Sequence, residues 1–389
     1  MGFAEFSYPG ATHNRYTHSL GAMHLAGVAF DQIFQSYAFS SKEVKWRLRQ
    51  TVRLASLLHD VGHGPLSHTT EEVMPSVGDL KIKIYNKDEK RRANHEDYTI
   101  KIVTDSSLSP ILKENFPDLK PQHIARLIDK HLHEDDDFFK DKGINLRPLL
   151  AQIISSELDV DRMDYLARDS YYCGTSYGHV DSDWIIANLT FYQNGNNLNL
   201  ALNRRALYTF DDFLISRYHM YLMVYFHHKG IVYDEMLLRY LRSPDCEFSL
   251  PSNVEEYIKY DDYRLYSQMN QSKNYWARAI SDRRPFRRLF ESHEQKGNVI
   301  SQLEKTLEKE GIKTIKANST GRLSKYYSGE GGGNDPIFVI DSDWGAQKAT
   351  RIEDTTEVFG KYQEARRIER LYVSREDFNR AQEITGRLV

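Results

Sequence analysis

The stretch LLHDVGHGPLSH, residues 57–68, ends an apolar run and is interrupted by glycine. It places His59 beside Asp60 and adds His63 and His68 shortly afterwards. A histidine and a carboxylate at the end of a helix can direct two metal ligands into one cleft. The two later histidines are near enough along the chain to act on whatever a metal holds there. The stretch therefore indicates metal-dependent chemistry carried by a helical fold.

Two outlying segments fit this stretch: YTHSLG, which contains His18, and ELDVDRMDYLARD, which contains Asp161. With them the chain resembles the HD-domain phosphohydrolases, and among these the deoxynucleoside triphosphate (dNTP) triphosphohydrolases. The segments that carry the resemblance occur in the family's order: YPGATHNRYTHSLG (8–21), LASLLHDVGHGPLSH (54–68), NHE (94–96), ELDVDRMDYLARD (157–169) and VYFHHKG (224–230). PIFVIDSDWG (336–345) and RRIERLYV (366–373) resemble the family's tail more weakly.

The resemblance implies a divalent metal ion as cofactor, with His18, His59, Asp60 and Asp161 as its ligands. Two imidazoles and two carboxylates suit a borderline-to-hard ion such as Mn, Fe, Ni, Zn or Mg. Cysteine is missing from the motif, which argues against a structural zinc site. Open coordination positions would accept a water molecule and a phosphate oxygen.

The resemblance also implies catalytic roles for several further side chains. It assigns His68 as the proton donor to the departing sugar oxygen, and Glu71, three residues on, lies where it can orient His68 on a helix. His63 and His95 match residues that contact the phosphates. We expect Glu96 to orient His95.

Five further residues match the family's substrate-binding positions. Arg15 and Arg162 would bind phosphate, for which a guanidinium offers two parallel hydrogen bonds. Tyr165 and Asp169 would line the sugar pocket, with Asp169 accepting from the 3′-hydroxyl. Tyr225 would crowd out a 2′-hydroxyl, which is how the family prefers deoxynucleotides.

The hydrophobic periodicity predicts a mainly α fold: an HD-domain helical bundle with a small β-hairpin and a C-terminal α+β lobe. A polar, proline-containing stretch at 243–257 favours a division into an HD phosphohydrolase core, residues 1–245, and a C-terminal helical lobe with short strands, residues 246–389. The hairpin is expected at 189–202, around an Asn-Gly turn. Helices are expected at 18–34, 44–60, 110–116, 123–132, 146–166 and 213–241.

Three segments allow two interpretations each. RRPFRRLF (283–290) could be a solvated helix face with its phenylalanines in the core. Alternatively, it could form a basic rim that binds nucleotide phosphate or nucleic acid. The acidic run 133–139 reads as a solvated loop or, less well, as a metal site. SGEGGGNDP (328–336) reads as a flexible loop before a short strand, since no GK[ST] follows its glycines to make a phosphate cradle.

Composition and charge narrow the class of protein. The net charge of −3 over 389 residues excludes a chain that binds polyanions with its whole surface. Two cysteines cannot form a disulfide framework, which fits a reducing cytosol. We find neither a signal peptide nor a long apolar run, so we expect a cytoplasmic protein without a membrane partner.

The resemblance further implies a homo-oligomer and a nucleotide effector held between subunits. Family members carry some tens of residues before the first motif, and that segment supplies part of the effector site, whereas this chain starts at Met1. Trp184 also stands where many relatives have an effector-binding arginine. We therefore expect assembly without nucleotide and a weak or altered effector response.

The function that these observations favour is metal-dependent hydrolysis of dNTPs to deoxynucleoside and inorganic triphosphate, in dNTP-pool control or in depletion of dNTPs against phage. One alternative is an HD phosphohydrolase that acts on another nucleotide or phosphate ester. Another is a nucleic-acid-binding regulatory module with a vestigial HD site, which would bind single strands in a salt-dependent way without turnover.

Overall fold

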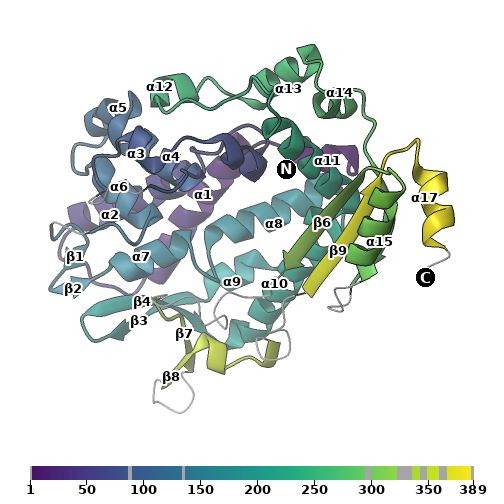
Figure 1. The fold of residues 1–389 in the computed structure, drawn as a ribbon. Helices are drawn as coiled ribbons and strands as arrows, with labels where there is room; N and C mark the ends of the chain where they lie inside the picture. Colours follow the sequence, from purple (N-terminus) through teal and green to yellow (C-terminus); the bar gives the residue numbers. More distant parts are fainter. Residues whose placement is uncertain are drawn as a thin grey trace.

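The computed structural model describes residues 2–85, 90–133, 136–293, 299–321, 335–341, 348–358 and 366–386. A bundle of helices forms the larger part, and a small mixed sheet and a three-stranded sheet lie at its edges (Figure 1). The expected mainly α fold with a small hairpin and a C-terminal α+β lobe is confirmed. Most of SGEGGGNDP lies outside the described residues.

The bundle is built around α1 (Arg15–Ile33), which packs along α2 (Lys42–Leu58) and against α8 (Val160–Cys173). Asn14 caps α1 and Ser41 caps α2, each by accepting a backbone N–H of the first turn, and small buried residues on α1 let α2 approach closely. The surrounding helices are α4 (His95–Asp105), α5 (Leu108–Asn115), α6 (Pro121–Ile128), α7 (Arg147–Ile154) and α9 (Ser182–Ala187).

Two long predicted helices are interrupted in the structure. The predicted helix 146–166 is two helices, α7 and α8, because the Asp159 side chain accepts the backbone N–H groups of Ser156 and Arg162 and starts a new helix. The predicted helix 213–241 is also broken: α10 (Leu207–Met220) runs into a π-helical turn, Tyr221–Tyr225, before α11 (His228–Leu241). Such turns re-aim side chains and occur often at functional sites.

The predicted hairpin is confirmed as β3 (Leu189–Asn194) and β4 (Asn197–Asn203), paired in antiparallel register from Leu189↔Leu202 to Asn194↔Asn197. Gly195, the first of the two loop residues, has a φ of +60°, which suits glycine. The sheet continues in the order β1-β2-β4-β7-β8. The added strands are β1 (Lys140–Asp141), β2 (Ile144–Asn145), β7 (Phe338–Asp341) and β8 (Lys348–Arg351).

The C-terminal lobe is an antiparallel sheet in the order β5-β9-β6, formed by β5 (Arg287–Ser292), β9 (Arg366–Val373) and β6 (Thr314–Gly321). Helices α15 (Val299–Lys309) and α17 (Phe378–Thr385) cover it around a separate small hydrophobic cluster. The helix expected within RRPFRRLF is wrong, because Arg287 onward pairs as a strand with β9. Phe286 nevertheless lies in the main core, as expected of its side chain.

Residues 246–286 lie across one side of the bundle as α12 (Val254–Tyr257), α13 (Asp262–Gln271) and α14 (Tyr275–Ser281) (Figure 1). Phe248, Leu250 and Tyr257 belong to the same hydrophobic core as α1 and α2. The predicted division of the chain into a core, residues 1–245, and a C-terminal lobe, residues 246–389, stays a prediction. Among the helices that the structure describes, none combines the length and the apolar character needed to cross a membrane.

Candidate functional site

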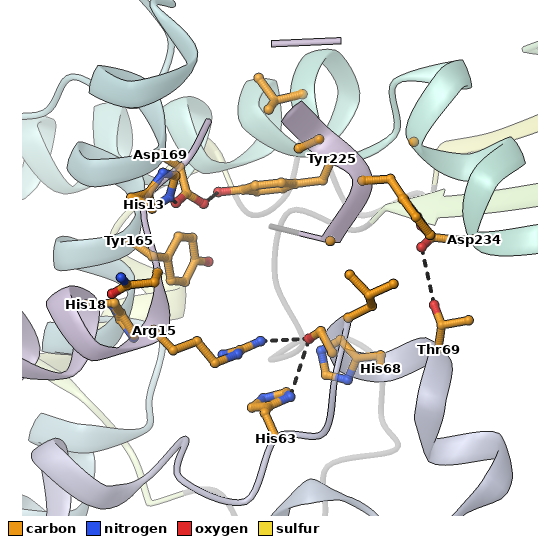
Figure 2. A pocket seen from close by; sticks show the side chains of 18 of the residues that line it. His13, Arg15, His18, His63, His68, Thr69, Tyr165, Asp169, Tyr225 and Asp234 are labelled. Atoms are coloured by element: carbon orange, nitrogen blue, oxygen red, sulfur yellow. Dashed lines mark hydrogen bonds and ion pairs between the residues drawn. The ribbon is translucent and has the colours of Figure 1, made fainter. Parts of the chain in front are cut away.

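A cavity of about 530 Å³ opens where the N-terminal end of α1, the 3-10 turn η2 (Ser67–Val73), α8, the π-helical turn and α11 meet. Arg15, His18 and Asp169 line one side of it, and His68, Thr69 and Asp234 line the other, with Tyr225 between them (Figure 2). Most of the predicted site residues line this cavity: Arg15, His18, Asp60, His63, His68, His95, Asp161, Tyr165, Asp169 and Tyr225. The other three predicted site residues, His59, Glu71 and Arg162, are not among the residues that line the cavity.

The four predicted metal ligands come together at the cavity wall. Oδ1 of Asp161 lies 3.1 Å from Nε2 of His18 and 3.3 Å from Nε2 of His59. The Asp60 carboxylate lies 3.5 Å from Nε2 of His59 and 3.9 Å from Nε2 of His18. One ligand atom from each of His18, His59 and Asp161 lies within 4.8 Å of the others, the spacing that a bound metal ion requires.

The hydrogen bonds of the two imidazoles fit a metal ion. Nδ1 of His18 donates to Oδ2 of Asp164 at 2.8 Å, and Nδ1 of His59 donates to the Ser56 carbonyl oxygen at 2.8 Å. A neutral imidazole that donates from Nδ1 presents a lone pair at Nε2, which is the arrangement found behind metal-ligating histidines. Nε2 of His59 is buried and lacks a hydrogen-bond partner among the described residues. The donor set therefore fits a divalent cation.

The electrostatics of the cluster favour positive charge at its centre. Burial lowers the pKa of His18, but hydrogen bonds to Asp161 and Asp164 outweigh it and raise the pKa to about 10. Burial also lowers the pKa of His59, but the neighbouring carboxylates of Asp161 and Asp60 outweigh this effect and raise the pKa to about 9. The pKa of Asp161 is lowered against its burial by the same two histidines. The carboxylates thus attract a cation. Without a bound metal, protons on the two imidazoles balance the negative charge of the carboxylates.

The two predicted phosphate-binding arginines differ in position. Arg15 lines the cavity, where its Nη1 donates to the Asp60 carboxylate and its Nη2 donates to Oγ of Ser67 at 2.6 Å. Arg162 lies outside the cavity lining and donates to the Ser156 carbonyl and the Asp159 carboxylate. The structure therefore brings Arg15 to the site and uses Arg162 to pair with the carboxylate that caps its own helix.

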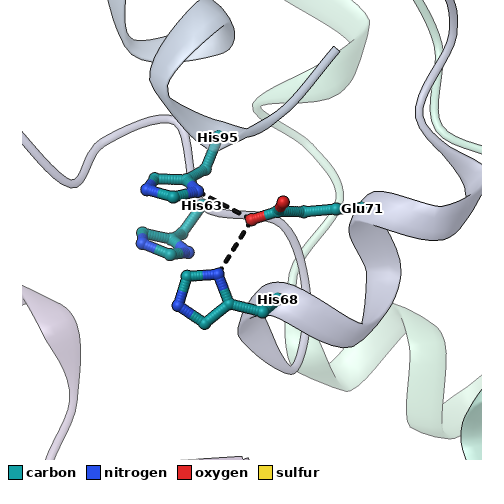
Figure 3. Close-up of side chains that lie close together, drawn as sticks. All are labelled: His63, His68, Glu71 and His95. Atoms are coloured by element: carbon teal, nitrogen blue, oxygen red, sulfur yellow. Dashed lines mark hydrogen bonds and ion pairs between the residues drawn. The ribbon is translucent and has the colours of Figure 1, made fainter. Parts of the chain in front are cut away.

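A second cluster holds the four predicted catalytic residues (Figure 3). Oε1 of Glu71 accepts from Nδ1 of His68 at 2.9 Å and from Nδ1 of His95 at 2.7 Å. The ring of His63 stacks on that of His95 with centroids 3.8 Å apart. Burial raises the pKa of Glu71, but hydrogen bonds to His68 and His95 outweigh this effect and lower the pKa to about 2. Glu71 is therefore an ionised carboxylate at neutral pH. The partner expected for His95, Glu96, is the wrong one: Glu96 is exposed, and Glu71 takes that role.

The members of this cluster differ in their exposure and protonation. His63 is kept neutral, because burial is the largest of the effects that lower its pKa to about 3. The side chain of His68 is 70% exposed and is free to meet a ligand in the cavity. The four side chains are also close enough to hold a cation, but Glu71 already accepts a hydrogen bond from two of the rings.

The far end of the cavity carries the predicted sugar-binding residues. Tyr225 donates its hydroxyl to Oδ2 of Asp169 at 2.7 Å, and Nε2 of His13 lies 2.6 Å from Oδ1 of the same carboxylate (Figure 2). The rings of Tyr165 and Tyr225 meet edge to face, with centroids 6.4 Å apart. The π-helical turn brings Tyr225 to this position. Asp169 is thereby fixed in orientation by two partners.

Sequence reasoning missed three polar residues at the site. His13 supports Asp169, and its place just before the helix that carries His18 is a signal for it. Asp164 supports His18 and follows Asp161 by one helical turn, so it shares that helix face. Asp234 bonds to Oγ1 of Thr69 at 3.3 Å at the other end of the cavity, and local sequence carries no signal for it.

The comparisons with known proteins agree with this arrangement. Residues 15–169 match the HD domain, and residues 180–319 match the HD associated region. The chain therefore contains an HD domain followed by an HD associated region, and it belongs to the HD superfamily.

Three particular proteins are similar to this chain. An uncharacterized protein of Mycoplasma genitalium is 33% identical over 65% of this chain and 55% of its own length. The deoxynucleoside triphosphate triphosphohydrolase SAMHD1 homolog of Dictyostelium discoideum is 30% identical over 68% of this chain and 47% of its own length. A hypothetical protein of Aquifex aeolicus has the same fold, with a TM-score of 0.74 and 25% identity over 99% of this chain and 90% of its own. The chain spans about half the length of the curated relatives it matches.

Proposed function

We propose that this protein hydrolyses dNTPs to deoxynucleoside and inorganic triphosphate. The observation that carries the proposal is the joining of three parts in one cavity: a cation-binding cluster, an exposed histidine held by a carboxylate, and a tyrosine–aspartate pair. These parts match the needs of a phosphate, a departing 5′-oxygen and a deoxyribose. The similarity to a SAMHD1 homolog supports the choice of dNTP among phosphate esters.

His18, His59, Asp60 and Asp161 would hold a divalent cation. A cation there supplies charge neutralisation at phosphate and lowers the pKa of a bound water. Asp164 and the Ser56 carbonyl keep the two imidazoles in the tautomer that presents Nε2.

His68 would protonate the departing 5′-oxygen. Its Nδ1 is engaged by Glu71, so the proton would leave from Nε2, the other ring nitrogen. A neighbouring carboxylate stabilises the imidazolium that must form before each transfer. The exposed side chain of His68 at the cavity wall allows contact with the leaving oxygen.

The triphosphate would lie along Arg15, His63 and His95. Arg15 is already oriented by Ser67, and its pairing with Asp60 would be replaced in part by phosphate oxygens. Arg162 would contribute its charge from behind Asp161, because direct contact requires it to release Asp159.

Tyr165, Asp169 and Tyr225 would bind the sugar. Asp169 already accepts from His13 and Tyr225, and its remaining lone pairs would accept from a 3′-hydroxyl. The Tyr225 ring, fixed by that hydrogen bond, would leave too little room for a 2′-hydroxyl. A ribonucleotide would then be rejected by crowding.

Product analysis tests the proposal. The purified protein is incubated with each dNTP, each NTP and a deoxynucleoside monophosphate, with Mn or Mg, and the phosphorus products are separated. We expect inorganic triphosphate from dNTPs, and no turnover by Asp161→Ala, which should also lose bound metal while its circular dichroism is unchanged. Pyrophosphate or phosphate as the product would favour another phosphohydrolase activity. Salt-dependent binding of single strands without turnover would favour the nucleic-acid module.

A further inference from the structure

The loop that carries the catalytic histidines has an unusual backbone. Leu66 and Ser67, which precede His68, have φ values of +54° and +65°. Two consecutive non-glycine residues in the left-handed region are unfavourable, because the Cβ atom of each crowds the backbone. Such a conformation persists where the surrounding structure holds it.

Two hydrogen bonds from α12 and α13 hold this loop, in addition to one from α4, where Oγ1 of Thr99 accepts from the Gly62 backbone N–H at 3.0 Å. The hydroxyl of Tyr257 donates to the Gly62 carbonyl oxygen at 2.6 Å, and Oδ1 of Asp262 accepts from the Leu66 backbone N–H at 2.8 Å. The two bonds lie on either side of His63 and Gly64 in the chain. Tyr257 and Asp262 both belong to the HD associated region, so neither is part of the HD domain itself.

Tyr257 is itself held rigidly. It is buried, and its ring stacks on Tyr98 of α4 with centroids 3.7 Å apart and planes 18° apart. The Tyr98 hydroxyl in turn donates to the Pro251 carbonyl oxygen at 2.7 Å. At Gly64 a Cβ atom would lie 3.3 Å from the Tyr257 hydroxyl and 2.9 Å from Oγ1 of Thr70, so the loop packs too closely for a larger residue.

The same loop sets the position of several site residues. Oγ of Ser67 accepts from Arg15 and lies 3.3 Å from Nδ1 of His63. His68 follows Ser67 directly and reaches Glu71. A change in the dihedral angles of Leu66 or Ser67 would therefore move His68 and break the contact to Arg15 together.

We propose that Tyr257 and Asp262 are positioning residues: the HD associated region holds loop 61–67 with Leu66 and Ser67 in the left-handed region, and thereby presents His68 and Ser67 to the cavity. The effect on turnover rests on the proposed function, whereas the effect on the loop does not. The HD domain alone would then form the metal-binding cluster but would lack a correctly placed proton donor.

The test compares four variants of the full chain with wild type. Tyr257→Phe removes only the hydroxyl, Asp262→Ala removes the acceptor, and Asp262→Asn keeps an acceptor oxygen. Tyr263→Phe is the control, since Tyr263 is 82% exposed on the same helix as Asp262. Amide hydrogen exchange of the 61–70 peptide reports on the loop, and kcat, metal content and melting temperature are measured in parallel.

We expect Tyr257→Phe and Asp262→Ala each to lower kcat and to speed exchange in the loop by about tenfold, the effect of losing one hydrogen bond. Metal content should be unchanged. Asp262→Asn and Tyr263→Phe should stay within about twofold of wild type, a difference of a few tenths of a kcal/mol.

Wild-type exchange in the loop of both Tyr257→Phe and Asp262→Ala would overturn the inference, and so would faster exchange with unchanged kcat. Asp262→Asn behaving like Asp262→Ala would overturn the acceptor role of Asp262. If Tyr257→Phe melts below the assay temperature, the comparison of Asp262→Ala with Asp262→Asn still tests the inference, because Asp262 is exposed and both variants are measured in the same way. A wild-type protein that hydrolyses no dNTP defeats the proposed function, whereas the exchange comparison still decides whether these residues hold the loop.

Discussion

Oδ2 of Asp164 lies 2.8 Å from Nδ1 of His18, and both side chains are buried. The carboxylate fixes the tautomer in which Nε2 of His18 faces Asp161, and it increases the basicity of the ring. Asp164 therefore acts on the cation-binding cluster from outside it. Its other oxygen accepts from Nη2 of Arg168 at 2.8 Å, so its orientation is fixed as well.

Asp164→Asn should weaken divalent metal binding by about 10- to 100-fold, the usual effect of removing such a supporting group. The measurement is a metal titration of the chelator-treated protein by calorimetry. Asp183→Asn, at an exposed position on α9, is the control and should leave the affinity unchanged. Equal affinities for Asp164→Asn and wild type would show that His18 does not need this partner.

His68→Ala should slow the chemical step about 10²- to 10⁴-fold, the contribution of a general acid, with metal retained. Single-turnover kinetics with dNTP, together with metal analysis, measure both quantities. His24→Ala, at an exposed position on α1, is the control and should be active. Loss of metal along with activity would instead make His68 a ligand, and full activity would mean that another group protonates the leaving oxygen.

Tyr225→Ala should narrow the preference for dNTP over NTP, because it removes the ring that crowds the 2′-hydroxyl and frees Asp169 from one of its partners. Tyr225→Phe keeps the ring and loses only its hydrogen bond to Asp169, so it should keep the larger part of the preference. The ratio of kcat/KM for dGTP and GTP is the measurement. A wild-type ratio near one would contradict the crowding argument before any variant is made.

The stability of the C-terminal lobe should depend on pH through the ionisation of Glu291. Burial would raise its pKa, but Arg370, whose Nε donates to Glu291 at 2.6 Å, and Arg288 lower the pKa to about 2. A lowered folded-state pKa stabilises the fold above the unfolded value near 4.5, and this contribution is lost as pH falls from there toward 2. Glu291→Gln should therefore cost about 1–3 kcal/mol at pH 7. The free energy of unfolding of wild type and Glu291→Gln is measured in urea at pH 7 and pH 3. The difference between the two proteins should be smaller at pH 3, and an equal difference at both pH values would contradict the prediction.

Some of the site followed directly from local sequence. Apolar periodicity indicates the helices expected at 18–34 and 44–60, which lead to His18 and His59, and the Asn-Gly turn indicates the hairpin. These features depend on interactions within a few residues, so a single sequence contains them. The family's motif order added the expected set of ligands, whose convergence in space it implied.

The tertiary structure decided what depends on distant partners. The breaks at Ser155–Asp159 and at Tyr221–Tyr225 lie inside patterns that read as continuous helix, because a helix can be interrupted by side-chain capping or by an inserted residue without losing its apolar period. The pairing of Glu71 with His95 in place of Glu96, and of Arg162 with Asp159, is fixed by packing between elements.

The sequence by itself thus determined the helical class of the protein and the chemical types gathered in its motifs, since periodicity and residue type are local properties. Only the tertiary structure decided which nitrogen of His18 and His59 faces the carboxylates, that His95 shares Glu71 with His68, and that Tyr257 and Asp262 contact the histidine loop. The reason is physical: Asp262 stands 196 residues from Leu66, and no local preference specifies a hydrogen bond over that separation.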